Sequence, residues 1–379
     1  MKKDIHPWRT HNKFTLLRDG EQFFPIIFEK INEAKDFVLI EMYLISSGKV
    51  VDQLIEALTA AIKRGVAVYL LLDDYGARGL NKSDRITLKH LGAKICFYNR
   101  FHLRYPLRYL PRDHRKIICI DYATSFTGGL GFHDCFLSSD TKIAWRESIV
   151  QIEGRNCQDW VESFRMSWKY STHRTLHLFS SSPLDTLYSQ QGHVAISPTD
   201  HGREIRRNII KNLRKAQKRI WLSTAYFVPS RKIRRLLRHA AKRGLDVRLI
   251  LPGAYIDHPG VRYAGRRFYA RLLHSNVKIY EYQPRFIHQK VVLIDNWVSI
   301  GSANMDRWNL RWNLEANQEV DNPDFAREVE NMLNEDLSHC VQLTYSEWCQ
   351  RTAWRRFLEW FWGGIDRILL KISEFKALW

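Results

Sequence analysis

The chain is poor in cysteine, and its cysteines are not arranged to bind metal. There are six among 379 residues, and none forms a Cys-x-x-Cys pair or has a histidine at the spacing of a zinc site. This excludes the common cysteine-based zinc centres. We expect free thiols in a reducing compartment, with Cys96 and Cys119 as ordinary core residues.

The sequence also lacks long apolar stretches. No window reaches about 18 uncharged apolar residues, the length that a transmembrane helix needs. The first residues, MKKDIHPWRTHNK, contain no hydrophobic core of a secretory signal peptide. We therefore expect neither a membrane-spanning helix nor a cleaved leader.

Acidic residues are scarce relative to basic ones. The chain has 40 Asp and Glu against 59 Lys and Arg, which gives a formal net charge of +19. An excess of this size predicts an anionic partner, either nucleic acid or an anionic bilayer surface. With 45% hydrophobic residues the chain can bury a sizeable core, and its length allows two or three domains.

The second half of the chain contains a short group of residues suited to phosphate chemistry. His288 and Lys290 precede the apolar run Val-Val-Leu-Ile, which predicts a buried strand with both side chains on one face; Asp295 follows it. An imidazole can attack phosphorus or shuttle a proton, and an ammonium can hold a phosphate oxygen. Donors suited to an oxyanion come next, at Gly301, Ser302 and Asn304.

The same pattern occurs in the first half. His114, Lys116 and Asp121 repeat the spacing, and Gly128 and Gly129 follow at nearly the same offset. A single His-x-Lys pair on a strand usually belongs to a solvent-exposed face without a function. Duplication of the whole pattern about half a chain apart is difficult to attribute to chance, so the sequence predicts a function for both copies.

The duplication extends beyond the two motifs. Residues 36–44 match 219–228, and residues 54–72 match 233–251. The longer pair predicts, in each half, an amphipathic helix, a stop at Lys-Arg-Gly and an apolar strand. A Ser-rich, weakly patterned stretch around residues 170–195 predicts the linker between the halves.

Two His-x-Lys-x4-Asp motifs in a duplicated α/β chain resemble the phospholipase D superfamily. Within it, GSANMDRWNLRWNLEANQE resembles the second motif of bacterial cardiolipin synthases, and the chain is most similar to their B-type branch, which lacks N-terminal membrane spans. The resemblance covers about residues 13–340. It implies an α/β fold of two duplicated domains, 1–185 and 186–345. Each would be a mixed β-sheet flanked by helices, and a pseudo-twofold axis would relate them around one shared active site.

The resemblance also implies which residues form the site. We expect the catalytic residues to be His114, Lys116, Asp121, His288, Lys290 and Asp295. We expect the substrate-binding residues to be Gly128, Gly129, Glu147, Gly301, Ser302, Asn304 and Glu315.

Each of these residues has an expected role. One histidine would become a phosphohistidine, for which we choose His114, and the other would protonate the leaving alcohol. A carboxylate from the opposite half would orient each imidazole, Glu315 for His114 and Glu147 for His288. The phosphate oxygens would be held by Lys116, Lys290, Ser302 and Asn304.

The reaction implied is phosphatidyl transfer from one phosphatidylglycerol to another, giving cardiolipin and glycerol without a metal or other cofactor. A phospholipase D-type hydrolase and a nuclease of the same superfamily remain alternatives. The expected partners are phosphatidylglycerol, other phospholipids and an anionic membrane surface, rather than nucleic acid. Gly129 and Gly131 stand where the second half has Ser302 and Asn304, so the halves are not expected to have equivalent roles.

The final segment, residues 346–379, departs from the repeat and is rich in tryptophan and arginine. Its apolar residues recur every three to four positions, and Gly363-Gly364 is expected to divide two short amphipathic helices. This pattern favours an interfacial membrane anchor over a helix docked on the core. Arginines among aromatics at 100–115 and 262–271 predict a basic rim beside the site, which suits the headgroup zone of a bilayer and equally suits single-stranded nucleic acid. We therefore expect a peripheral protein on the cytoplasmic face of the bacterial inner membrane.

Overall fold

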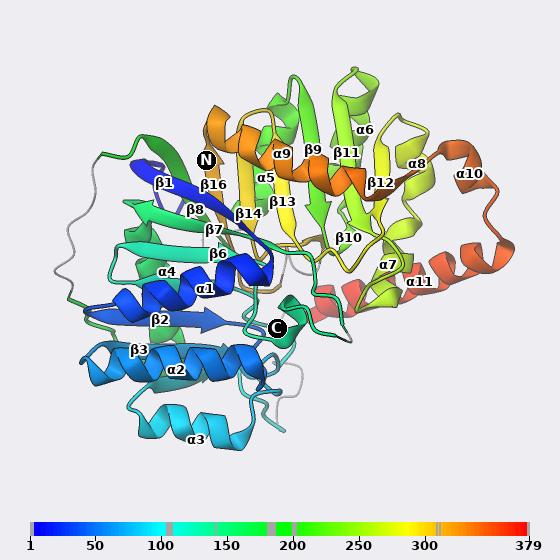
Figure 1. The fold of residues 1–379 in the computed structure, drawn as a ribbon. Coiled ribbons are helices and arrows are strands. Elements are labelled where there is room, and N and C mark those ends of the chain that lie inside the picture. The colour runs from blue at the N-terminus through cyan, green and yellow to red at the C-terminus, as the bar shows by residue number, and fades with distance from the viewer. Residues whose placement is uncertain are drawn as a thin grey trace.

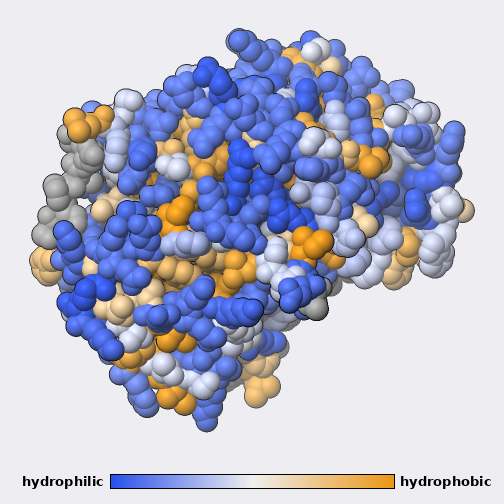
Figure 2. Space-filling model, in the orientation of Figure 1, coloured by the Kyte–Doolittle hydropathy of each residue, from blue (hydrophilic) through white to orange (hydrophobic). Residues whose placement is uncertain are grey.

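The computed structural model describes residues 4–103, 109–140, 142–179, 187–198, 203–307, 310 and 312–376, with side chains in the last helix described up to residue 366. Figure 1 shows two groups of strands, one from each half of the chain, with helices packed against their faces. On the face drawn in Figure 2, hydrophilic side chains dominate and apolar ones are scattered between them, as expected for a chain with 26% charged residues.

The strands of the two halves correspond one to one. The first half contains β1 (Arg9–Arg18), β2 (Phe37–Met42), β3 (Ala67–Asp73), β4 (Lys94–Tyr98), β5 (Lys116–Ile120), β6 (Thr124–Gly128) and β7 (Ser148–Gly154). The second contains β8 (Gln190–Ser197), β9 (Arg219–Thr224), β11 (Asp246–Pro252), β12 (Lys278–Tyr282), β13 (Lys290–Ile294), β14 (Trp297–Gly301), β16 (Glu315–Asp321) and an added edge strand, β17 (Cys340–Leu343). The short strands β10 (Phe227–Val228) and β15 (Met305–Asp306) pair separately.

The order of strands is the same in both halves. It runs β1-β7-β6-β5-β2-β3-β4 in the first and β8-β16-β14-β13-β9-β11-β12-β17 in the second. The strand pairing is mixed in both halves, because β2 and β9 each have a parallel and an antiparallel neighbour. The predicted α/β fold of two mixed sheets with flanking helices is confirmed. The halves are not two separate sheets, however, since β1 pairs with β8 and joins them into one sheet of 15 strands.

Helices cover both halves of the sheet. The first half contributes α1 (Asp19–Glu33), α2 (Lys49–Lys63), α3 (Lys82–His90), the 3-10 turn η2 (Asp134–Phe136) and α4 (Asn156–Thr172). The second contributes α5 (Glu204–Lys215), α6 (Arg231–Lys242), α7 (Pro259–Arg266), α8 (Tyr269–Leu273), α9 (Pro323–Ser338), α10 (Tyr345–Cys349) and α11 (Ala353–Lys376). The predicted domain boundary between residues 185 and 186 lies outside the described residues, so the domain limits stay a prediction.

Helices α2 and α6 end as the Lys-Arg-Gly pattern predicts. Each is followed by an arginine and then by a glycine in the left-handed region, with φ of 92° at Gly65 and 90° at Gly244. That conformation is strained for residues with a Cβ, so glycine ends the helix and turns the chain into the next strand. The strands that follow, β3 and β11, are the parallel neighbours of β2 and β9.

The chain exchanges backbone contacts between the halves just before each motif strand. The amide of His114 donates to Leu314 O at 2.9 Å, and the amide of His288 donates to Arg146 O at 2.8 Å. Leu314 and Arg146 each precede a glutamate, at 315 and 147. The two bridges therefore bring the glutamate of one half to the histidine of the other.

The tail differs from its predicted form. It is not divided at Gly363-Gly364, because α11 runs unbroken through both glycines and the break lies earlier, between Cys349 and Ala353. Glycine is a weak helix former, but packing compensates: Gly363 lies against Arg267, which also pairs with Asp366 at 2.6 Å. Trp379 and the side chains beyond Asp366 lie outside the described residues.

The tail is docked on one side and exposed on the other. Trp348 is 3% exposed and packs against Tyr269 with ring centroids 5.0 Å apart, whereas Trp354 and Trp360 are 65% and 66% exposed. Phe357 and Phe361 share the exposed side, and the Phe357 ring contacts those of Trp354, Trp360 and Phe361. Among the described residues, no helix combines the length and apolar character that crossing a bilayer requires.

The predicted basic rims are largely engaged within the protein. Arg112 pairs with Asp73, and Arg262 and Arg266 pair with Glu281. Buried or half-buried guanidinium groups held in this way support the fold rather than offer charge to lipid. Residues 104–108 of the first rim lie outside the described residues.

Candidate active site

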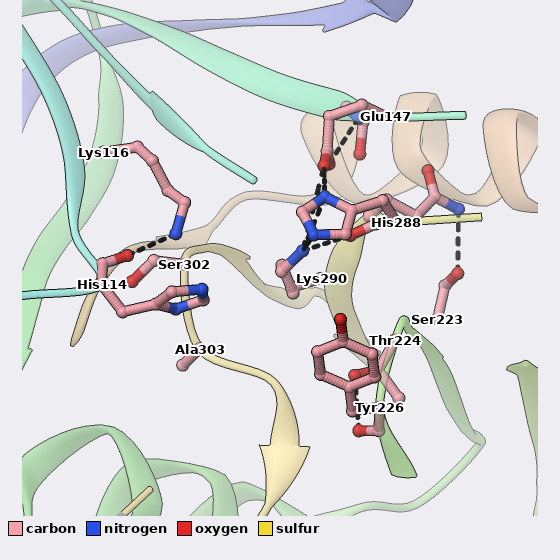
Figure 3. Close-up of polar contacts among 12 residues, drawn as sticks. His114, Lys116, Glu147, Ser223, Thr224, Tyr226, His288, Lys290, Ser302 and Ala303 are labelled. Carbon is pink, nitrogen blue, oxygen red and sulfur yellow. Dashed lines mark hydrogen bonds and ion pairs between the residues drawn. The ribbon is translucent and has the colours of Figure 1, made fainter. Parts of the chain in front are cut away.

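The two motifs meet in one cluster at the junction of the halves. His114 and His288 stand just before β5 and β13, and Lys116 and Lys290 are the first residues of those strands. Figure 3 shows both histidines and both lysines turned toward a common centre. All four are buried, so the cluster is not part of a solvated surface.

Glu315, the first residue of β16, holds the imidazole of His114. The His114 Nδ1 atom lies 2.9 and 3.1 Å from the two carboxylate oxygens of Glu315. The Ser302 hydroxyl donates to the same carboxylate, and the Ala316 amide donates to the Ser302 hydroxyl at 3.0 Å. The structure thus places Ser302 on Glu315. Its hydroxyl helps to orient the carboxylate, and its expected contact with a phosphate oxygen stays a prediction.

Glu147 holds the imidazole of His288 in the equivalent way. Its Oε2 atom lies 2.7 Å from His288 Nδ1, and its Oε1 atom accepts a hydrogen bond from the Ser148 amide at 2.9 Å. Gly129 occupies the position that Ser302 has in the other half, and a Cβ there would lie 2.2 Å from Glu147 Oε2. The glycine leaves room for the carboxylate, so the departure between the halves has a steric cause.

The two glutamates have opposite electrostatic character. Burial raises the pKa of Glu315 well above its usual value, although Lys116 and the Ser302 hydrogen bond act against it. Burial also acts to raise the pKa of Glu147, but the charge of Lys290 and the hydrogen bond to His288 outweigh it and lower that pKa. Glu315 is therefore the stronger base of the two, and Glu147 stays ionised.

The pKa values of the two histidines also differ. Burial, with the charges of Lys116 and Lys290, lowers the pKa of His114 well below its usual value. Burial and Lys290 also lower the pKa of His288, but Glu147 and Asp257 act to raise it. His114 is thus held as a neutral imidazole with an available lone pair. His288 is the one that accepts a proton more readily.

Both lysines are poised to lose their charge near neutral pH. Burial lowers the pKa of Lys116 to about 7 and that of Lys290 to about 8. Lys116 Nζ donates to the backbone oxygen of His114 at 2.5 Å, and Lys290 Nζ lies 2.9 Å from His288 Nε2. Each ammonium is therefore anchored beside the imidazole of its own motif.

Asp121 and Asp295 do not belong to this cluster. They lie at the opposite ends of β5 and β13, where Asp121 accepts the amides of residues 35–37 and Asp295 those of residues 217–219, at 2.6 to 3.0 Å. Both have positive φ, near 53°. These contacts fix the entry of β2 and β9. A catalytic role for Asp121 and Asp295 stays a prediction.

The remaining predicted residues surround the cluster. Gly128 and Gly301 end β6 and β14, and a Cβ at either would strike the neighbouring strand, so both permit close strand pairing. Asn304 is fully buried, and neither its Oδ1 nor its Nδ2 has a hydrogen-bond partner among the described residues. A buried amide in that state fits a residue that binds substrate.

Comparison with known proteins identifies the family. The family described as "Cardiolipin synthase, PLD-like domain" matches residues 27–168 and 209–337, once in each half. The chain belongs to this family. A cardiolipin synthase A from Pseudomonas putida strain W619 is 33% identical over 349 residues, which cover 89% of this chain and 71% of that protein. A cardiolipin synthase B from Shigella flexneri is 31% identical over 360 residues, which cover 92% and 86%.

A solved structure supports the fold independently. The crystal structure of phosphatidylserine synthase from Haemophilus influenzae Rd KW20 superposes with a TM-score of 0.69 over 98% of this chain and 96% of that chain, at 14% identity. The sequence-based resemblance to bacterial cardiolipin synthases is confirmed, and so is the prediction of an enzyme of the phosphatidyltransferase type, by the family match and the curated relatives.

The sequence analysis did not predict the aromatic residues that lie beside the histidine cluster. Tyr43 packs edge-on against His114 with ring centroids 4.8 Å apart, and Lys116 Nζ lies 5.0 Å from the Tyr43 ring. Trp145 lies 5.1 Å from the His288 ring. Tyr226 also lies beside the cluster (Figure 3). Tyr43 directly follows β2, and Tyr226 closely follows β9. Both lie inside the matching segments 36–44 and 219–228, and this shared position is the sequence signal that could have identified them.

One group with the composition of a metal site lies elsewhere. Asp4, His193 and Glu204 offer ligand atoms within 4.8 Å of one another, but Arg207 pairs with both carboxylates. His193 lies opposite Glu319 on β16, four residues along the strand from Glu315. The group is an ion-pair cluster between β8 and α5, outside the histidine cluster.

Proposed function

We propose that this protein is a cardiolipin synthase that transfers a phosphatidyl group from one phosphatidylglycerol to the hydroxyl of another and releases glycerol. The observation that carries the proposal is the pair of buried histidine–glutamate contacts, His114–Glu315 and His288–Glu147, each formed across the two halves. Two cationic lysines between them supply the positive charge that a phosphodiester needs. The cardiolipin synthases among its relatives supply the substrate class.

In the first step, the Nε2 atom of His114 attacks the phosphorus of phosphatidylglycerol. The bond between phosphorus and the glycerol oxygen breaks, and that oxygen takes a proton from His288. As the phosphohistidine forms, the Nδ1 proton of His114 passes to Glu315, whose raised pKa makes it the stronger base. Lys116, Lys290 and Asn304 stabilise the charge on the phosphate oxygens.

In the second step, the hydroxyl of another phosphatidylglycerol loses its proton to His288 and attacks phosphorus. The bond between phosphorus and His114 breaks, the proton returns from Glu315 to Nδ1, and cardiolipin leaves. Glu147 stays ionised because its pKa is lowered, so it stabilises the imidazolium of His288 in both steps.

Two alternatives use the same site. A phospholipase D-type hydrolase would admit water as the acceptor, and a superfamily nuclease would bind nucleic acid instead of lipid. The exposed aromatic side of α11 favours a lipid substrate, because tryptophan and phenylalanine at helical spacing fit a bilayer interface.

We infer that the protein associates peripherally with the cytoplasmic face of the inner membrane. The exposed Trp354, Phe357, Trp360 and Phe361 would insert, and the net charge of +19 would attract anionic lipid. The six cysteines are free thiols, which fits a reducing compartment.

Lipid analysis of a cardiolipin-free bacterial strain that expresses the protein tests the function. Cardiolipin and free glycerol should appear together. Phosphatidic acid in place of cardiolipin would support the hydrolase, and unchanged lipids alongside cleavage of nucleic acid would support the nuclease.

A further inference from the structure

Tyr226 and Asp257 form a polar pair beside the histidine cluster. Tyr226 lies two residues after β9, and Asp257 lies in the loop between β11 and α7. The Tyr226 hydroxyl donates to Asp257 Oδ2 at 2.6 Å. Figure 3 places the Tyr226 ring in the close-up of the site, with its hydroxyl end toward Lys290. The pair plays no part in the two steps described above.

The backbone around Tyr226 is fixed rather than loose. The Thr224 hydroxyl donates to Tyr226 O and accepts the Met305 amide, both at 3.1 Å. The next two residues form β10, whose Val228 pairs with Asp306 in β15. Tyr226 is therefore held against the segment that carries Ser302 and Asn304, which keeps its hydroxyl in place during the reaction.

A carboxylate near a phosphate site requires a reason, since it repels the phosphodiester. Asp257 acts on the cluster directly: its charge raises the pKa of His288 and of Lys290 against the effect of burial. Burial and Asp257 also raise the pKa of Tyr226, so its phenol stays protonated. The contacts of Asp257 among the described residues are made through Oδ2.

This arrangement fits a ligand that donates hydrogen bonds. The second oxygen of Asp257 and the phenol oxygen can both accept from hydroxyl groups. An ammonium headgroup would satisfy the same acceptors, but it would face the charges of Lys290 and Lys116 nearby. A neutral polyol meets the acceptors without that repulsion.

We propose that Tyr226 and Asp257 bind the hydroxyl groups of the glycerol headgroup, as a polyol subsite on the His288 side of the active site. The inference rests on the proposed function, in which His288 protonates the departing glycerol and deprotonates the incoming one. The subsite places the reacting headgroup beside the acid and base, and it makes the enzyme prefer a glycerol acceptor over a simple alcohol.

Competition between two acceptors tests the subsite. The purified protein would be given vesicles of phosphatidylglycerol with ethanol present, and the ratio of cardiolipin to phosphatidylethanol would be measured. Tyr226→Phe and Asp257→Asn should each lower this ratio roughly tenfold, since each removes or weakens a hydrogen bond to the polyol. Departure of glycerol from the donor is common to both acceptors, so any change in that step cancels in the ratio.

Tyr255→Phe is the matched control. Tyr255 lies in the same loop, is 59% exposed and should leave the ratio unchanged. Unchanged ratios in both Tyr226→Phe and Asp257→Asn, with wild-type melting temperatures, would overturn the subsite. If the wild-type protein transfers phosphatidyl groups to neither acceptor, the proposed function itself fails, which is a different result.

Discussion

Gly129 lies directly against the carboxylate of Glu147, and a Cβ atom at this position would come 2.2 Å from Oε2 and 2.7 Å from Cδ. The corresponding residue of the other half, Ser302, hydrogen-bonds to Glu315 instead. The two halves thus orient their glutamates differently. One uses a hydroxyl donor, and the other leaves space and relies on the Ser148 amide.

Gly129→Ser makes the first half resemble the second and should nevertheless damage the enzyme. The side chain would displace Glu147 from His288, and loss of an oriented acid–base residue lowers kcat by about 10²-fold or more. The measurement is kcat for cardiolipin formation. Gly364→Ser is the control, because a Cβ there meets nothing within 4 Å. Wild-type kcat in Gly129→Ser would contradict the steric explanation.

The pH dependence of the activity should reflect the titration of Lys116 and Lys290. Burial lowers the pKa of Lys116 to about 7 and that of Lys290 to about 8, and a lysine is charged below its pKa and neutral above it. The ratio kcat/KM, which reports the free enzyme, should therefore fall as pH rises through about 7 to 8, in addition to any earlier fall caused by deprotonation of His288, whose pKa is lowered. On the acid side, burial and the nearby charges lower the pKa of His114, so this residue is protonated only at a more acidic pH than an ordinary histidine. A kcat/KM that stays level up to pH 10 would contradict this account.

The roles of the histidines can be separated with an activated substrate. A phosphatidyl ester of p-nitrophenol has a leaving group that needs no proton. His288→Ala should therefore still release p-nitrophenol at a substantial rate, whereas His114→Ala should release none. With phosphatidylglycerol, both variants should be inactive, because the general acid alone contributes about 10²–10⁴-fold. The reverse pattern would make His288 the nucleophile.

Membrane binding should depend on the exposed side of α11. The double variant Trp354→Ala/Trp360→Ala should bind anionic vesicles at low salt but leave them as salt rises, because charge attraction is screened beyond about 10 Å at 0.1 M. The unmodified protein should remain bound, since apolar insertion is not screened. Vesicle flotation measures this, and Tyr170→Ala, which alters a 72% exposed aromatic on α4, is the control. Salt-resistant binding by the double variant would make α11 only a docked helix.

Much of this architecture could be predicted from local sequence. The Lys-Arg-Gly stops define α2 and α6 because a left-handed glycine, such as Gly65, acts within its own turn. The motifs identified both histidines and both lysines, because strand alternation fixes their side. Resemblance to a family supplied the pairing of Glu315 with His114, which spans 201 residues and has no local signal.

The sequence could not reveal features that depend on a distant contact. Asp121 and Asp295 share the motif but lie at the far ends of their strands, away from the histidine cluster, and the pattern alone does not show this. Gly363-Gly364 does not break α11, because Arg267 on the end of α7 packs against the helix. Asp257 comes from a loop whose position depends on the whole second half, and no pattern around it distinguishes it.

The central claim is that both halves build one active site. The most direct test is cardiolipin synthesis by purified His114→Ala and His288→Ala, each checked for a wild-type melting temperature. If the halves share one site, both variants should form cardiolipin at less than about one hundredth of the wild-type rate. Near-normal synthesis by either variant would show that one half works alone, and it would contradict the account.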